Sequence, residues 1–252
     1  MNKLAIVTGA SSGIGEATAR RLAKLGYNLV ITARRRERLE KLAAELISNY
    51  GIKIQILNFD VRDREATEQA LSSIDKNLGQ VCVLMNNAGL AAGLEHIDQG
   101  STDDWDRMID TNVKGVLYVT RIVSKMMIEA GGGHIFNVGS IAGIQTYENG
   151  AVYCASKHAM HALSQGMRID FLKYGIKVTE LRPGMVETEF STVRFHGDQD
   201  RADNVYKGVT PLVGDDIAAV IEYCLSLPAH VNLNDIEIMP TQQANAYYTH
   251  RK

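Results

Sequence analysis

The sequence predicts an α/β fold with a doubly wound, seven-stranded parallel sheet and helices on both faces. Two observations predict it. Short apolar runs that are typical of buried strands alternate with helical patterns along the chain, and such alternation produces a parallel sheet that is covered on both sides. A glycine-rich turn also joins the first strand to the first helix, as it does in doubly wound sheets. Right-handed crossovers then give the strand order 3-2-1-4-5-6-7.

The elements follow one another in a regular order. The predicted strands are Leu4–Val7, Asn28–Thr32, Lys53–Asn58, Cys82–Met85, His134–Val138, Lys177–Leu181 and Ile236–Met239. The predicted helices are Gly13–Leu25, Arg36–Ser48, Arg64–Leu78, Thr102–Glu129, Ala151–Leu172 and Asp215–Leu227. No repeat, low-complexity stretch or linker interrupts this alternation, so we expect a single domain over residues 1–252.

One irregular stretch follows the sixth strand. Between Pro183 and Thr210 the chain is rich in glycine and polar residues. A long loop at the carboxyl end of a strand lies where doubly wound folds bind their ligands, and such loops are usually functional. We therefore predict a substrate lid at about residues 185–210, and this segment is called the lid below.

The turn after the first strand has the features of a phosphate-binding loop. It runs Thr8-Gly-Ala-Ser-Ser-Gly-Ile-Gly15, between a strand and a helix. That placement directs free backbone N–H groups and the positive end of a helix towards a pyrophosphate, and glycine lets the backbone approach the ligand. The predicted contacts are Gly9, Ser11, Ser12, Gly13, Ile14 and Gly15. The alternative is a tight turn that binds no ligand.

The end of the second strand predicts which dinucleotide binds. An NAD-binding protein usually has an acidic residue there to hold the ribose hydroxyls, but this chain continues Ala33-Arg34-Arg35-Arg36. Guanidinium groups suit a phosphate. We therefore predict NADP(H), with Arg34 as the leading contact and Arg35 as the second. The alternative is that these arginines are only the solvated start of the next helix.

Tyr153 and Lys157 indicate proton transfer. They lie four residues apart in a predicted helix, so their side chains share one face. A free tyrosine ionises near pH ~10, and we expect the lysine charge to lower that pKa towards the range of a general acid or base. A second pair with this spacing, Tyr248 and Lys252, lies in what we expect to be a frayed C-terminus. Only Tyr153 has an apolar run that ends in a serine, Ser140, shortly upstream.

Composition restricts the possible partners. The chain has 252 residues, 45% of them hydrophobic and 22% charged, with a net charge of −2. These values are typical of a soluble globular protein and argue against nucleic acid or an anionic membrane as partner. We expect neither a signal peptide nor a membrane span. The three cysteines form no CxxC pair, which favours a cytoplasmic location.

Together these motifs resemble the short-chain dehydrogenase/reductase family over essentially the whole chain, which implies a Rossmann-type fold. The matching pieces are the glycine loop, Asp60-Val61, Asn86-Asn-Ala-Gly89, Asn112, Ser140, Tyr153 with Lys157, and Pro183-Gly184. The resemblance implies further cofactor contacts: Asp60 and Val61 at the adenine, Asn87, Ala88 and Gly89 along the central strand, then Pro183, Gly184 and Val186, and Thr188 at the nicotinamide carboxamide. It also implies a homotetramer.

Segments near the C-terminus resemble one branch more closely, that of the NADP-dependent 3-hydroxy acid dehydrogenases. They are Thr188–Phe195, Leu227–Asn234 and Met239-Pro240-Thr241. The resemblance implies a small-molecule substrate such as L-allo-threonine, L-serine or malonic semialdehyde. Two alternatives remain open. One is a reductase of another carbonyl, such as a 3-oxoacyl thioester, and the other is a protein that senses NADPH without turnover.

The catalytic prediction assigns one role to each of four residues. Tyr153 exchanges the proton with the substrate oxygen, Ser140 hydrogen-bonds that oxygen, and Lys157 holds the ribose and lowers the tyrosine pKa. By resemblance, Asn112 stabilises a water that passes protons to bulk solvent through Lys157. The alternatives are a turn residue for Ser140 and a helix residue bonded to nearby backbone for Asn112.

We expect Arg194 in the lid to bind a substrate carboxylate, because a guanidinium matches carboxylate geometry. The alternative is a salt bridge within the lid or between subunits. Tyr147 and Gln145 are expected to line the substrate pocket. We expect no metal, because no acidic residue or cysteine near His158 and His161 in the sequence completes a ligand set; a solvated or interface helix face is the better account of these histidines.

Overall fold

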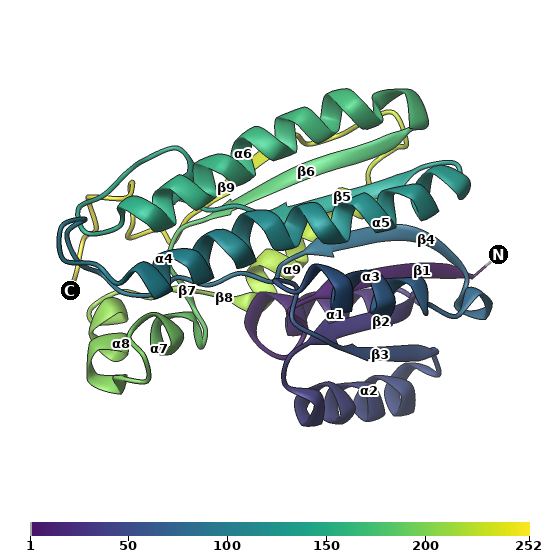
Figure 1. Ribbon diagram of the computed structural model, residues 1–252, viewed down its shortest axis with the longest axis horizontal. Helices are drawn as coiled ribbons and strands as arrows, with labels where there is room; N and C mark the ends of the chain where they lie inside the picture. The colour runs from purple at the N-terminus through teal and green to yellow at the C-terminus, as the bar shows by residue number, and fades with distance from the viewer. Residues whose placement is uncertain (1) are drawn as a thin grey trace.

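The computed structural model describes residues 2–252 and shows a twisted sheet between two layers of helices (Figure 1). The seven parallel strands lie in the order β3-β2-β1-β4-β5-β6-β9. Their bounds are Lys3–Thr8 (β1), Asn28–Ala33 (β2), Ile54–Asn58 (β3), Gln80–Asn86 (β4), Gly133–Val138 (β5), Ile176–Pro183 (β6) and Asp235–Ile238 (β9). The predicted fold and strand order are confirmed. The last strand is numbered β9 because two short strands, Val186–Glu187 (β7) and Leu212–Val213 (β8), form a separate parallel pair.

The helices divide between the two faces of the sheet. The elements are Gly13–Lys24 (α1), Arg36–Tyr50 (α2), Arg64–Ser72 (α3), Thr102–Ile109 (α4), Val116–Glu129 (α5), Ala151–Phe171 (α6), Phe190–Arg194 (α7), Gln199–Tyr206 (α8) and Gly214–Ser226 (α9). Helices α1, α2 and α9 contribute to one hydrophobic core, and α3, α5 and α6 contribute to the other. Figure 1 shows α5 and α6 running side by side along the sheet.

The pattern within β1 shows why the sheet has two cores. Its side chains alternate between the faces, as in any strand. Ala5 and Val7 pack with α1, α2 and α9, whereas Leu4 and Ile6 pack with α3, α5 and α6. All four are at most 1% exposed. Both faces must therefore be apolar, which explains the continuous hydrophobic run that the sequence shows.

Two predicted helices differ from the structure. The helix expected over Arg64–Leu78 ends at Ser72, and a separate 3-10 turn follows at Lys76–Leu78 (η1). That turn begins where the Asp75 carboxylate accepts a hydrogen bond from the backbone N–H of Asn77. The helix expected over Thr102–Glu129 is continuous, but a π-helical turn at Asp110–Gly115 (η2) separates α4 from α5.

The C-terminal segment is ordered, so the expectation of a frayed end is wrong. The backbone N–H of Lys252 donates to the Gly208 carbonyl at 3.0 Å, and the Arg251 guanidinium donates to the carbonyls of Val205 and Lys207. The end of the chain therefore packs against the lid, which contains β7, α7 and α8. In residues 2–252, no helix has the length and apolar character that crossing a membrane requires.

Candidate active site

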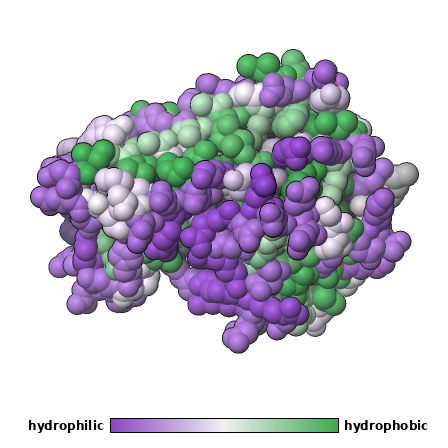
Figure 2. All heavy atoms as spheres, viewed as in Figure 1, coloured by the Kyte–Doolittle hydropathy of each residue, from purple (hydrophilic) through white to green (hydrophobic). Residues whose placement is uncertain are grey.

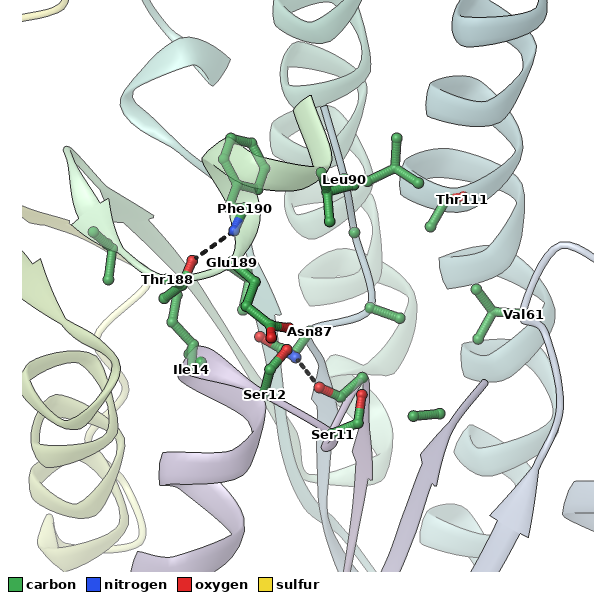
Figure 3. A pocket seen from close by; sticks show the side chains of 18 of the residues that line it. Ser11, Ser12, Ile14, Val61, Asn87, Leu90, Thr111, Thr188, Glu189 and Phe190 are labelled. Atoms are coloured by element: carbon green, nitrogen blue, oxygen red, sulfur yellow. Dashed lines mark hydrogen bonds between the residues drawn. The ribbon is translucent and has the colours of Figure 1, made fainter. Parts of the chain in front are cut away.

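A cavity of about 300 Å³ opens at the carboxyl ends of the strands, where doubly wound folds bind ligands. Ser11 and Ser12 lie on one side of it, and Thr188, Glu189 and Phe190 lie on the lid side (Figure 3). The predicted cofactor contacts that line this cavity are Gly9, Ser11, Ser12, Gly13, Ile14, Arg34, Arg35, Asp60, Val61, Asn87, Ala88, Gly89, Tyr153, Lys157, Pro183, Gly184, Val186 and Thr188. The cavity thus brings together predicted cofactor contacts from six separate regions of the sequence.

Gly15 is the one predicted cofactor contact that does not line the cavity. A Cβ there would lie 2.5 Å from the Gly9 carbonyl oxygen and 2.4 Å from Asn87 Nδ2. Gly15 is therefore required for close packing beneath the loop. Asn87 holds the loop from the neighbouring strand end, because its Nδ2 donates to the carbonyls of Thr8 (2.9 Å) and Gly9 (3.1 Å).

The glycine loop fits a bound pyrophosphate. Gly9 and Gly13 have φ of +66° and +56°, the left-handed region that favours glycine. A Cβ at Gly13 would lie 2.9 Å from Thr188 Cγ2, so any side chain there would fill the space between loop and lid. The loop leads directly into α1, and the first residues of that helix, Gly13 and Ile14, line the cavity. The free N–H groups at a helix N-terminus favour an anion there.

Basic side chains lie at the neighbouring end of the cavity. The Arg35 guanidinium donates to Ser11 Oγ through Nε (3.2 Å) and Nη2 (3.0 Å), and to Ser12 Oγ through Nη2 (2.8 Å). Arg34 also lines the cavity, with Nη1 3.9 Å from a carboxylate oxygen of Asp60. These residues fit a phosphate at the position that the sequence predicts, because arginine binds phosphate oxygens through paired N–H donors.

Tyr153, Lys157 and Ser140 all line the same cavity. Tyr153 and Lys157 are 8% and 5% exposed, and both lie on the inner face of α6. The Lys157 ammonium donates to the Val138 carbonyl at 2.8 Å and lies 5.8 Å from the centre of the Tyr153 ring. The Ser140 hydroxyl accepts from the Ala142 N–H at 3.1 Å, so Ser140 also begins the 3-10 turn Ile141–Gly143 (η3).

The electrostatics of Tyr153 differ from the prediction. Burial raises the pKa of Tyr153, and the neighbouring Tyr147 raises it further, whereas the Ser140 hydroxyl and the Arg194 charge lower it. The pKa is raised overall, so the expected net lowering by Lys157 is wrong for this arrangement. The physical reason is that desolvation of the phenolate outweighs the nearby charges. Burial also lowers the pKa of Lys157 to about 8, against the opposite effect of Glu180.

Asn112 lies in the π turn and not on the cavity wall. Its Oδ1 accepts from the Leu90 N–H at 2.9 Å, and its Nδ2 donates to the Leu90 carbonyl at 2.8 Å and to Ser156 Oγ at 3.0 Å. The side chain therefore ties the loop after β4 to α6. It is bonded to nearby backbone, as the alternative interpretation of this residue expected. Both N–H donors are used, so a water at this side chain would be held by the second lone pair of Oδ1, and the water contact stays a prediction.

Arg194 lies between two aromatic rings. Its guanidinium carbon is 5.5 Å from the centre of the Tyr147 ring and 5.7 Å from that of Tyr153. Its Nε donates to the Gly93 carbonyl at 3.2 Å, and within residues 2–252 the buried Nη2 has no hydrogen-bond partner and the side chain forms no salt bridge. A cation with a spare donor thus stands beside the phenol that we expect to react.

Two further residues, Tyr147 and Gln145, were predicted to line the substrate pocket, and neither lines the main cavity. Tyr147 is mostly buried and packs in the small apolar cluster around Tyr153, although it does not line the main cavity. Gln145 does not line the cavity either, and its Oε1 accepts a hydrogen bond from the Ala246 N–H at 2.8 Å. This side chain anchors the C-terminal segment, and its contact with substrate stays a prediction.

Sequence reasoning missed several lining residues. They are Thr32, Ala33, Phe59, Leu90, Thr111, Val138, Gly139, Glu189, Phe190 and Val193. Phe190 and Val193 are three apart on α7, a spacing that places both on one helix face. An apolar pair within the polar lid was a signal that could have identified them.

Of the two histidines expected on a solvated or interface face, His158 is exposed, whereas His161 turns towards a buried carboxylate. Its Nδ1 is 2.6 Å from Oε2 of Glu180, whose side chain is fully buried. His161, Glu180 and Asp235 offer ligand atoms within 4.8 Å of one another, a set that comes from α6, β6 and β9 and is invisible in the linear sequence. Arg168 already neutralises Asp235 at 2.6 Å, so the charge of this cluster is largely balanced by protein groups.

The comparisons with known proteins agree with this geometry. Residues 3–199 match the family described as short chain dehydrogenase. The chain is 43% identical over 245 residues to sulfoacetaldehyde reductase 2 of Chromohalobacter salexigens, covering 97% of this chain and 96% of the relative. It is 43% identical over 244 residues to an NADP-dependent 3-hydroxy acid dehydrogenase of Salmonella typhi, covering 96% and 97%.

A solved structure supports the same assignment. The closed form of a serine dehydrogenase complexed with NADP+ has a TM-score of 0.91 and 41% identity, covering 99% of this chain and 100% of that one. Fold, cavity residues and full-length relatives all agree with the resemblance that the motifs predicted. The chain therefore belongs to the short-chain dehydrogenase family.

Proposed function

We propose that this protein is an NADP-dependent oxidoreductase that interconverts a small 3-hydroxy acid and its 3-oxo or semialdehyde partner. The observation that carries the proposal is the meeting of Tyr153, Ser140 and Lys157 in one cavity with the phosphate loop and Arg34 and Arg35. The names of the relatives support both cofactor and substrate class: one is an NADP-dependent 3-hydroxy acid dehydrogenase, and a serine dehydrogenase was solved with NADP+.

The residues in the cavity divide the binding of the cofactor among them. The glycine loop holds the pyrophosphate, Arg34 and Arg35 hold the 2′-phosphate, Asp60 and Val61 frame the adenine, and Thr188 meets the carboxamide. Bound NADP(H) supplies the hydride chemistry, and the protein supplies position and proton transfer.

Tyr153 manages the proton at the substrate oxygen. Its raised pKa keeps it protonated near neutral pH, which is the form that donates a proton when a carbonyl is reduced. In the oxidation direction the phenolate form of the same oxygen, stabilised by the charges of Arg194 and Lys157, takes the hydroxyl proton and becomes the phenol. Ser140 hydrogen-bonds the substrate oxygen and fixes its distance from Tyr153. Asn112 maintains the loop and helix contacts behind this group.

Arg194 is the proposed partner of the substrate carboxylate. The unpartnered Nη2 and the position beside Tyr153 support this role. The name of one relative is also consistent with it, because sulfoacetaldehyde carries an anionic group one methylene away from the aldehyde carbon, as does the predicted substrate malonic semialdehyde. A single cation beside Tyr153 serves both.

A substrate panel tests the proposal. NADP+ reduction is measured with L-serine, L-allo-threonine and 3-hydroxyisobutyrate, and NADPH oxidation with sulfoacetaldehyde and a 3-oxoacyl thioester. We expect the small acids to react and the thioester to fail. A preference for the thioester would replace the proposed substrate class, and NADPH binding without turnover on any substrate would favour a sensor.

Arg194→Ala separates the carboxylate contact from the rest of the site. The KM for serine should rise by about tenfold or more, because a charged hydrogen bond contributes about 1.5–3 kcal/mol. An uncharged secondary alcohol should show little change, and Arg194→Lys should recover part of the loss. Equal effects on charged and uncharged substrates would contradict the role.

We also propose a homotetramer in the cytoplasm. Small residues of α6 support close contact between subunits, since Ala151, Ala155 and Ala162 are exposed and face away from the sheet. Ile169, near the end of the same helix, and Leu172, which directly follows its last residue, are 76% and 77% exposed. Three free cysteines are consistent with a reducing compartment.

A further inference from the structure

A carboxylate of the lid reaches across the cavity to the cofactor-binding arginines. Glu189 follows Thr188 at the start of α7 and lines the cavity. Its Oε2 accepts from Arg35 Nη1 at 2.6 Å, and its Oε1 accepts from Arg38 Nη1 at 2.7 Å. In Figure 3 its side chain points from the lid towards Ser12 and Asn87, which lie on the opposite side of the cavity.

Arg35 is the group on which this contact depends. Its Nε and Nη2 are bonded to the hydroxyls of Ser11 and Ser12, and Nη1 is bonded to Glu189. The same guanidinium and the same two serines are the residues assigned to the phosphates of NADP(H). The Glu189 carboxylate therefore already uses a donor that a phosphate at this end of the cavity would need.

The charge of Glu189 is secure at neutral pH. Partial burial raises the pKa of Glu189, but the guanidinium groups of Arg38 and Arg35 together lower it below its usual range. The base of the lid also packs closely on the phosphate loop, because a Cβ on Gly13 would lie only 2.9 Å from Thr188 Cγ2. The Glu189 carboxylate thus links the lid to Arg35 and Arg38, and Arg35 in turn contacts the serines of the phosphate loop.

We propose that Glu189 is a specificity-determining latch that competes with the 2′-phosphate of NADP(H) for Arg35. The proposal rests on the assignment of Arg35 to that phosphate. A dinucleotide that carries the 2′-phosphate replaces Glu189 on Arg35, so that Arg38 alone still holds this carboxylate of the lid. A dinucleotide without it leaves the ion pair intact. Glu189 therefore lowers the affinity for NADP(H) and ties movement of the lid to the phosphorylated cofactor.

Binding titrations with Glu189→Gln test the latch. Glu187→Gln is the matched control. It removes the same charge two positions before Glu189, and the Glu187 side chain forms no ion pair within residues 2–252. Nicotinamide fluorescence gives the Kd of each protein for NADPH and NADH. Glu189→Gln should lower the Kd for NADPH by roughly threefold to fivefold, the upper part of the range expected for partly exposed ion pairs. The Kd for NADH should change by less than about twofold, and the control should match wild type for both.

Limited trypsin digestion gives a second readout, because Arg194 and Arg201 lie in the lid. In Glu189→Gln, without added cofactor, cleavage in the lid should be faster than in wild type and in Glu187→Gln. A weaker affinity for NADPH would overturn the proposal, since Glu189 would then hold the lid over the cofactor. An unchanged affinity, or an equal gain for NADPH and NADH, would also overturn it.

These measurements need no turnover, so they are independent of the substrate assignment. If wild-type protein binds NADPH but oxidises none of the hydroxy acids, the proposed function fails and the latch can still be judged. If the acids are oxidised and the Kd for NADPH is the same in wild type and Glu189→Gln, the latch fails alone.

Discussion

Tyr153 and Lys157 work in a dry environment, and this sets their chemistry. Each is nearly inaccessible to solvent, so burial disfavours the phenolate on one and the ammonium on the other. Near neutral pH burial therefore keeps Tyr153 as the neutral phenol, whereas Lys157, with a pKa of about 8, still carries its charge. Arg194 and Ser140 act against this tendency at the phenol. Proton transfer thus depends on groups from the lid and from the turn after β5 as well as on the helix that carries the pair.

Tyr153→Phe isolates the hydroxyl. The ring should keep its edge contact with Phe190, whose centre is 5.6 Å away, so we expect the Kd for NADPH to stay within about twofold of wild type. Turnover should fall by at least about a hundredfold, the usual contribution of a positioned proton donor. Steady-state kinetics and a binding titration measure both. Near wild-type turnover would remove Tyr153 from the mechanism.

Lys157→Met should alter how stability depends on pH. The pKa of Lys157 is about 8 in the folded protein against an ordinary 10.5, so the unfolded chain binds more protons between these values. The destabilising effect is fully present below pH 8 and disappears as the pH rises to 10.5. The free energy of unfolding of wild type relative to Lys157→Met should therefore increase over this range, by up to about 3 kcal/mol.

Urea unfolding of both proteins at pH 7, 8, 9 and 10 measures the difference. A difference that stays flat across the series would mean that Lys157 is not desolvated in the folded protein. A difference that falls would mean that the ammonium gains a stabilising partner on folding.

At the scale of elements, the loops and turns that connect helices and strands supply most of the site residues. The glycine loop joins β1 to α1, the π turn between α4 and α5 carries Asn112, and the 3-10 turn after β5 begins at Ser140. Such turns place backbone groups where a regular helix or strand could not. The lid joins β6 to α9 and supplies Glu189 and Arg194.

Two glycine substitutions compare the cost of adding a Cβ beneath the phosphate loop with its effect in the middle of a helix. Gly15→Ala would force a Cβ to 2.5 Å from the Gly9 carbonyl, so it should destabilise the protein by about 1–3 kcal/mol and weaken NADPH binding. Gly166→Ala lies within α6 with no atom within 4 Å of the added Cβ, so it should stabilise by about 0.5–1 kcal/mol. Urea unfolding measures both. Similar effects at the two positions would contradict the packing argument.

On the scale of the whole molecule, apolar side chains gather over α5 and α6. Figure 2 shows this band against a mostly hydrophilic lower half. Leu117, Ile169 and Leu172 contribute to the exposed apolar surface. Contiguous apolar surface of this kind marks protein–protein contact. The face therefore supports the proposed assembly of several subunits through α5 and α6.

Charged substitutions on this face should dissociate the assembly. The double variant Ile169→Asp, Leu172→Asp places two charges where each apolar side chain would contribute about 1.5–3 kcal/mol on burial. Light scattering after size exclusion should show wild type as a tetramer and the variant as a smaller species. Ile47→Asp, on α2 at the opposite face and 45% exposed, is the control and should leave the mass unchanged. A monomeric wild type would contradict the proposal.

The sequence by itself determined the sheet and most of the cofactor cavity. Strand order follows from the alternation of apolar runs and helical patterns, since right-handed crossovers leave few topologies. The glycine loop, Arg34 and Arg35, and the pair Tyr153 and Lys157 were visible because local spacing alone places their groups. These features depend on backbone geometry within a few residues.

Only the tertiary structure decided what depends on contacts between distant segments. The sign of the pKa change at Tyr153 comes from burial, and the use of Gln145 comes from a C-terminal segment about a hundred residues away. His161 meets Glu180 across α6 and β6, and Glu189 meets Arg35 across the cavity. Desolvation and contacts between distant segments leave no periodic pattern in the sequence, so residue spacing could not reveal them.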